Sequence, residues 1–199
     1  IDFYSPAPIT LPAAGPEVSK KILDLVNSEK ITFHNSKKII RVEPKKLIFE
    51  NDEYSFDILL AIPPHTAPKV IYDSNLAKEP GFIPINRDCK TPHENIFAVG
   101  DVTSLVVTDS MAVPKAGVFA EGEGIAVAKN IVSKLLSKEP SVLFDGKGGC
   151  FLESGRDTAS TIEVDMFADP KPSTRLTEST KDNLSKKLDF EKERLSKWL

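Results

Sequence analysis

The sequence has little of what metal centres and disulfide-bonded scaffolds require. Only two cysteines and three histidines occur among its 199 residues, and Cys89 and Cys150 lie far apart in the chain. Disulfide frameworks and zinc sites need clustered ligands at short, regular spacings, which these isolated residues do not provide. We therefore expect no metal site in this chain.

Long apolar runs and blocks of positive charge are also missing. No stretch approaches the roughly 20 apolar residues that span a bilayer, and no secretory hydrophobic segment opens the chain. The formal net charge is −3, and without a basic cluster nucleic acid is not expected as a partner. Hydrophobic and charged contents of 40% and 28% are typical of a globular protein with a real core, and we expect a cytoplasmic one.

The first third of the chain predicts alternating strands and helices. It begins at Ile1, without methionine and already in a strand-like segment, as expected of a piece of a longer protein or of a domain trimmed near its start. Residues 56–62 form an apolar run interrupted only by Asp57, which fits a central parallel strand buried on both faces. In order, we expect a strand at 1–4, a helix at 17–29, a strand at 31–34, a hairpin at 39–49 and this central strand.

A short apolar run further along ends in a glycine and an acid. Ile96 to Val99 predicts a buried strand, and Gly100-Asp101 follows it directly. Ligands bind at the carboxyl ends of strands in open α/β sheets. An ionised carboxylate there accepts hydrogen bonds strongly from sugar or polyol hydroxyls. The alternative is a strand followed by a tight turn that binds nothing.

A second candidate site lies at the start of the next helix. Helical spacing runs from Gly117 to Leu136, and Pro114-Lys115 stands just before it. Free N–H groups and partial positive charge at a helix start, together with a lysine, suit a delocalised anion. The alternative is a solvated lysine. The pair Gly122 and Gly124 lies inside this helix without the third glycine of a dinucleotide-binding loop, so it is not such a loop.

The last third predicts a small domain of strands and one helix. Strands are expected at 142–152 and 158–167, with the glycine-rich residues 146–149 interpreted as a turn, and a loop is expected at 168–180. Residues 181–199 form an amphipathic helix with leucines on one side and mixed charges on the other. Earlier in the chain, Cys89 stands among polar residues that predict an exposed loop.

Two segments carry a resemblance to a known family. Residues 91–102 (TPHENIFAVGDV) and 113–121 (VPKAGVFAE) resemble the second FAD-contacting segment of the two-dinucleotide-domain flavoproteins. In that family the aspartate binds the ribityl chain, and the start of the following helix points at the pyrimidine edge of the flavin. The resemblance therefore implies FAD as cofactor, with contacts from Gly100, Asp101, Pro114, Lys115 and Ala116.

Three further pieces point to one branch of that family. Residues 56–68, residues 149–155 and the lysine-rich tail ending in Trp198 resemble the sulfide:quinone oxidoreductase and flavocytochrome c sulfide dehydrogenase branch. The resemblance implies Cys150 as a catalytic residue, paired with a cysteine outside this sequence, in an enzyme that passes electrons from sulfide through FAD to a quinone. Three alternatives stay open: an NADH:quinone-type flavin oxidoreductase, a non-catalytic fragment that does not bind FAD alone, and a merely structural Cys150.

The expected architecture is α/β, with partial FAD/NAD(P)-binding Rossmann-like domains and a small α+β C-terminal domain. Residues 1–79 would be the second half of the NAD(P)-like domain, 80–140 the closing segment of the FAD domain, and 141–199 the C-terminal domain. Sulfide and quinone are the expected small-molecule partners. By analogy with quinone-using relatives, the terminal helix would touch the inner face of the cell membrane, or alternatively dock on its own domain or form a homo-oligomer contact.

Overall fold

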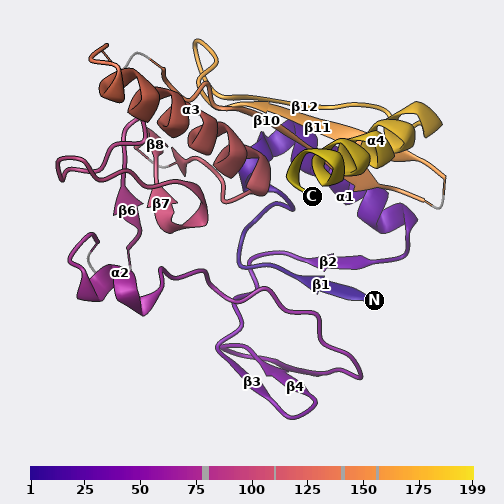
Figure 1. The fold of residues 1–199 in the computed structure, drawn as a ribbon. Coiled ribbons are helices and arrows are strands. Elements are labelled where there is room, and N and C mark those ends of the chain that lie inside the picture. Colours follow the sequence, from indigo (N-terminus) through magenta and orange to yellow (C-terminus); the bar gives the residue numbers. More distant parts are fainter. Residues whose placement is uncertain (78–80, 110, 140–141, 156) are drawn as a thin grey trace. The chain divides into compact units, whose positions relative to one another are not determined.

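The computed structural model describes residues 1–77, 81–109, 111–139, 142–155 and 157–199. Their contacts divide the chain into two compact units, Ile1–Pro64 and His65–Leu199 (Figure 1). Each unit mixes helices and strands, which agrees with the α/β class expected from the sequence. The domain boundaries expected at 79/80 and at 140/141 lie outside the described residues.

The first unit opens with a strand–helix–strand arrangement. Strand β1 (Asp2–Tyr4) runs parallel to β2 (Thr32–His34), and helix α1 (Gly15–Ser28) connects them after the short 3₁₀ helix η1 (Pro12–Ala14). Pro16 stands at the start of α1, where its missing N–H costs nothing. The predicted strands and helix are confirmed, and the parallel pair needs such a crossover because its strands cannot be joined by a tight turn.

A small antiparallel sheet completes this unit. Strands β3 (Arg41–Glu43), β4 (Lys46–Ile48) and β5 (Glu53–Ser55) pair in that order, so the predicted hairpin is confirmed. Aromatic rings join this sheet to β1: the ring centroid of Tyr4 lies 5.1 Å from that of Phe49 and 5.3 Å from that of Tyr54. Such tilted pairs add stability beyond the area they bury.

The expected central strand at 56–62 is wrong. The structure has no strand there, and the exposed fractions of Ile58, Leu60 and Ile62 are 82%, 93% and 89%. A central strand needs neighbours on both edges to bond its N–H and C=O groups, and the described strands of this unit pair only among themselves. An apolar run indicates a preference for burial, but it does not supply the partner strands.

The second unit begins with short elements that lead to a long helix. Helix α2 (Lys69–Asp73) comes first, and β6 (Ile83–Pro84) then pairs in parallel with β7 (Thr103–Ser104). The 3₁₀ helix η2 (Gly100–Val102) precedes β7, and the hairpin β8 (Val106–Thr108) and β9 (Met111–Ala112) follows it. Helix α3 (Gly117–Leu135) agrees with the predicted helix.

Two expectations about residues 86–99 are wrong. Residues 96–99 form no strand; Phe97 makes a single antiparallel bridge to Lys90, and Ile96 and Val99 are 40% and 37% exposed. Cys89 has 0% exposure and belongs to the core cluster around Phe119 and α3. Local polarity did not reveal this burial, because the core that surrounds Cys89 comes from residues distant in the sequence.

A three-stranded antiparallel sheet and one helix form the end of the chain (Figure 1). Strands β10 (Lys147–Glu153), β11 (Ala159–Asp165) and β12 (Ser173–Leu176) pair in sequence order, and α4 (Lys181–Trp198) follows. Residues 147–149 belong to β10 rather than to the expected turn, and β12 lies in the segment 168–180 that was expected to be a loop. A strand of four residues has too short a pattern of alternating polar and apolar residues to be predicted from its own sequence.

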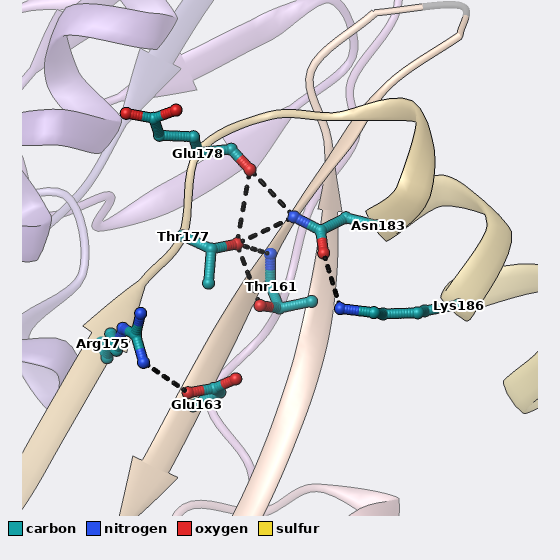
Figure 2. Close-up of polar contacts among 7 residues, drawn as sticks. All are labelled: Thr161, Glu163, Arg175, Thr177, Glu178, Asn183 and Lys186. Carbon is teal, nitrogen blue, oxygen red and sulfur yellow. Dashed lines mark hydrogen bonds and ion pairs between the residues drawn. The ribbon is translucent and has the colours of Figure 1, made fainter.

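A polar network fixes the start of α4 to the sheet (Figure 2). Asn183, only 7% exposed, donates from Nδ2 to Thr177 Oγ1 at 3.1 Å and to the carbonyl oxygen of Glu178 at 2.9 Å. Thr177 Oγ1 also accepts from the backbone N–H of Thr161 on β11 at 2.8 Å. Together with the N-cap bond from Asn183 N–H to Thr180 Oγ1 at 3.1 Å, this network sets the direction in which α4 leaves the sheet.

Candidate functional site

The five residues proposed as cofactor contacts lie around one cavity in the second unit. Gly100 and Asp101 come from η2, and Pro114, Lys115 and Ala116 from the segment that leads into α3. The cavity volume of about 10 Å³ accommodates roughly one water molecule. The fold therefore brings these two segments together, and a large ligand would have to lie at the mouth of the cavity rather than inside it. The cavity is also lined by Thr103, Val113, Phe119, Ala120 and Glu123.

Gly100 forms a turn that only glycine adopts readily. Its φ is +78°, and a side chain built on it would begin 3.4 Å from the Cβ atom of Ala120. Its N–H donates to Glu123 Oε2 at 2.6 Å, and its carbonyl oxygen accepts from Thr103 Oγ1 at 2.8 Å. The turn is thus held on both sides, while the side chain of Asp101 beside it is exposed.

The start of α3 has free hydrogen-bonding capacity. Its N-cap residue Ala116 offers no side chain to the first N–H groups, and its carbonyl oxygen accepts from the N–H groups of Phe119 and Ala120. Apart from its chain neighbours and the helix's own backbone, no atom lies within 4 Å of a Cβ built on Gly117. An uncapped helix start with room beside its first residue is suited to bind an anion or a polarised carbonyl edge.

Lys115 is fixed within the fold, so the alternative of a freely solvated lysine does not describe it. Its Nζ donates to the carbonyl oxygen of Thr103 at 2.6 Å and lies 3.7 Å from the ring centroid of Phe82. Burial lowers the pKa of the Lys115 ammonium, while the negative charges of Asp101 and Glu123 act in the opposite direction. The cation therefore stays beside the cavity with a defined position.

Glu123 is a residue of this site that the sequence analysis did not identify. It is 2% exposed, and burial raises the pKa of its carboxyl group. The hydrogen bond from the N–H of Gly100 and the charge of Lys115 lower that pKa, and the charge of Asp101 raises it. An acid placed between two glycines, Gly122 and Gly124, was the available signal.

Cys150 lies on the face of its sheet that is directed toward α3. A Cβ on Gly148 would meet Phe119 of α3 at 2.5 Å, and Cys150 points to the same side two residues later, about 7 Å along the strand. The opposite face carries Phe151, whose ring centroid lies 5.7 Å from that of Phe190 on α4. Cys150 thus lies on the same face of the sheet as Gly148, which packs closely against Phe119, a residue that lines the cavity.

The two thiols are free and differ in access. Cys150 is exposed, yet the groups packed beside its sulfur raise the pKa of its thiol. Burial raises the pKa of Cys89 to about 12, and Glu123 and Asp88 add to the effect. Since only the thiolate is nucleophilic, neither cysteine is activated by its surroundings in this structure.

Comparison with known proteins identifies the family. Residues 5–129 match the family model of pyridine nucleotide-disulphide oxidoreductases. The match covers more than half of the 199 residues, so the chain belongs to this family. The flavoprotein resemblance carried by residues 91–102 and 113–121 is thereby confirmed at the level of the family.

Solved structures show the same fold. The sulfide:quinone oxidoreductase from the hyperthermophilic bacterium Aquifex aeolicus matches with a TM-score of 0.84 and 24% identity, covering 99% of this chain and 49% of that chain. A FAD-dependent pyridine nucleotide-disulphide oxidoreductase from Desulfovibrio vulgaris matches with a TM-score of 0.59, 14% identity and coverages of 82% and 42%. The ferredoxin reductase for the CYP199A2 system from Rhodopseudomonas palustris matches with a TM-score of 0.60 and 15% identity, covering 83% of this chain and 41% of that chain.

These matches confirm a partial Rossmann-like α/β fold. The chain spans about half or less of the length of each of the three structures. Among the described residues, no group of three or more histidine, cysteine or acidic side chains is placed to hold a metal ion. The described helices include none with the length and apolar character needed to cross a membrane.

Proposed function

We propose that this chain forms the flavin-contacting part of an FAD-dependent oxidoreductase of the sulfide:quinone type. One observation carries the proposal: the Gly100–Asp101 turn and the segment 114–116 surround one cavity, although they are separated in sequence. The likeness to the fold of the Aquifex aeolicus enzyme over 99% of this chain supports the same assignment.

The residues at this cavity fit an FAD molecule at its mouth. The exposed carboxylate of Asp101 can accept hydrogen bonds from ribityl hydroxyls. The uncapped start of α3 and the Lys115 ammonium can face the polar edge of the flavin ring. When bound, FAD supplies reversible acceptance of two electrons, and these residues bind and orient it.

Cys150 would take part in the sulfur chemistry. In this proposal it forms a disulfide with a second cysteine. Hydrosulfide attacks one sulfur of that disulfide, the S–S bond breaks, the other cysteine leaves as a thiolate, and the attacked cysteine carries the sulfur as a persulfide. The overall reaction consumes HS⁻, one proton and a quinone, and it yields zero-valent sulfur and a quinol. Cys89 does not serve as the second cysteine, since it is fully buried with a pKa of about 12.

An NADH:quinone-type flavin oxidoreductase is the second candidate. The observation that favours it is the raised pKa of Cys150, which leaves the thiol mostly protonated at neutral pH. Replacing Cys150 by serine in a full-length enzyme that contains this chain separates the two. Sulfide-dependent quinone reduction should be lost in the variant, and undiminished turnover with sulfide would remove Cys150 from the mechanism.

Riboflavin provides a direct test of the site in the 199-residue chain, because it carries the ring and the ribityl chain without the diphosphate. A few hydrogen bonds at an open site predict a dissociation constant on the order of 1 mM, measured by quenching of riboflavin fluorescence. Asp101→Asn should weaken binding several-fold, and Asp57→Asn, an exposed acid of the first unit, should not. Equal affinities of the three proteins would contradict the assignment of Asp101.

FAD itself is expected to bind this chain weakly. The sequence holds no glycine-rich loop of the type that binds a pyrophosphate at a helix start, and the cavity takes only one water molecule. These two facts also favour the alternative that the chain alone is not catalytic. A flavin absorbance band that survives gel filtration of the chain would contradict this expectation.

A further inference from the structure

Glu123 is a buried acid whose role in the site is not yet accounted for. Its side chain lies on α3 at 2% exposure and lines the cavity beside Asp101 and Lys115. Burying an ionised carboxylate costs free energy unless a charged or hydrogen-bonding partner compensates for the lost water. Glutamine would accept a hydrogen bond from the same N–H without that cost, but a weaker one than a carboxylate accepts, so an acid at this buried position points to a use for its charge.

The contact made by Glu123 is to the backbone of the turn that presents Asp101. Its Oε2 accepts from the N–H of Gly100 at 2.6 Å, and Gly100 holds a φ of +78°. Hydrogen bonds to an ionised acceptor are about twice as strong as those between neutral groups. The residue that follows Gly100 is Asp101, so any change in this turn moves the Asp101 carboxylate.

We propose that Glu123 is a positioning residue of the cofactor site: through the Gly100 N–H, its carboxylate holds the Gly100–Asp101 turn against α3 and so presents Asp101 at the mouth of the cavity. The proposal rests on the function proposed above, because positioning Asp101 matters only if Asp101 binds the ribityl chain. The hydrogen bond itself can be measured without any cofactor.

The charged groups around Glu123 make this contact sensitive to pH. Asp101 from η2 and Lys115 from the segment before α3 share the cavity with it, and the Cys89 thiol donates to the backbone oxygen of Glu123 at 3.8 Å. Burial raises the pKa of Glu123. As the pH falls through this raised pKa, the carboxyl group gains a proton, the hydrogen bond from Gly100 weakens, and the turn loosens.

Amide hydrogen exchange of Gly100, followed by NMR, tests the contact. In Glu123→Ala the Gly100 amide should exchange about 10- to 100-fold faster than in the wild-type protein, as expected for losing a hydrogen bond to a charged group. Glu123→Gln keeps an acceptor but loses the charge, so the Gly100 amide should exchange faster than in the wild-type protein at neutral pH, by a smaller factor than in Glu123→Ala. Glu121→Gln removes the same charge from the same helix, where Glu121 pairs with Arg194 and Lys197, and should leave Gly100 unchanged.

The pH dependence separates positioning by charge from simple packing. Protection of Gly100, corrected for intrinsic exchange, should decrease in the wild-type protein between neutral pH and the ordinary range of a glutamate, and should stay level in Glu123→Gln. This comparison decides the proposal even if Glu123→Ala does not fold. Equal pH profiles in the wild-type protein and in Glu123→Gln, or unchanged exchange in a folded Glu123→Ala, would overturn it.

Riboflavin affinity distinguishes this proposal from the proposed function. If both hold, affinity at neutral pH falls in Glu123→Ala and falls by a smaller factor in Glu123→Gln. If riboflavin binds none of the proteins, the flavin assignment fails, while the exchange rates of Gly100 still decide whether Glu123 holds the turn. If Glu123→Ala frees the turn but binds riboflavin as the wild-type protein does, positioning of Asp101 for the cofactor is refuted.

Discussion

The two cysteines should react with thiol reagents in two well-separated phases. Cys150 is exposed, whereas Cys89 has no exposed surface and a thiol pKa of about 12. At pH 8 a pKa of about 12 leaves about one thiolate in ten thousand molecules, and an ordinary cysteine of pKa about 8.5 leaves about one in four. Relative to an ordinary cysteine, the lower thiolate fraction alone slows Cys89 by more than three orders of magnitude. Relative to Cys150, whose pKa is also raised, the ratio of thiolate fractions is smaller, and the burial of Cys89 widens the difference in rate.

Ellman's reagent measures this directly through the absorbance of the released thiolate. The native protein should release one equivalent quickly and the second only in denaturant. The fast phase should disappear in Cys150→Ser and remain in Cys89→Ala. Because the pKa of Cys150 is raised, the fast rate should increase about tenfold per pH unit between pH 7 and pH 8.5 without a plateau.

Two results would refute this reasoning. Rapid release of two equivalents from the native protein would show that Cys89 is accessible, as its polar sequence neighbours had suggested. A rate for Cys150 that is already level at pH 7 would show an activated thiolate, with a pKa that its surroundings lower rather than raise. The second result would strengthen the case for sulfide chemistry, since a preformed thiolate is the more effective nucleophile.

Three further predictions concern stability and surface contacts. Asn183→Ala should destabilise the protein by about 1–3 kcal/mol in urea unfolding, because it removes two hydrogen bonds made by a side chain that is 7% exposed. A loss below about 0.5 kcal/mol would contradict the network in Figure 2. Because the pKa of Glu123 is raised, its ionisation lowers the stability of the folded protein above that pKa. Glu123→Gln should therefore stabilise the protein at neutral pH and much less at pH 4. Equal gains in the free energy of unfolding at the two pH values would contradict this prediction. If α4 touches membranes, the fluorescence of Trp198, the single tryptophan and 63% exposed, should shift to the blue with anionic vesicles, and an unchanged spectrum would exclude contact there.

Local patterns in the sequence were sufficient for several elements. The spacing of apolar residues predicted α3 and α4 within a few residues of their observed bounds, because an amphipathic helix satisfies its own backbone hydrogen bonds and needs only one face covered. The hairpin β3–β4 was predicted for a similar reason, since its two strands are joined by a short polar turn. Such elements depend on neighbours within a few residues.

Segments that depend on distant partners were predicted less well. Residues 56–62 and 96–99 have the composition of buried strands, yet the described structure gives the first no partner strand and the second a single bridge. Strand β12 was missed because it forms only against β11. A strand's hydrogen bonds come from another part of the chain, so composition alone does not establish that it forms.

The candidate site likewise has features that depend on local sequence and features that depend on distant parts of the chain. The sequence by itself singled out Gly100-Asp101 and Lys115, because a glycine–acid pair and a lysine at a helix start have a local chemical meaning and carry the family resemblance. Only the tertiary structure placed them around one cavity, buried Cys89, and put Glu123 against the N–H of Gly100. Burial and hydrogen-bond partners are properties of the packed chain, and the pKa values and positions of these groups follow from that packing.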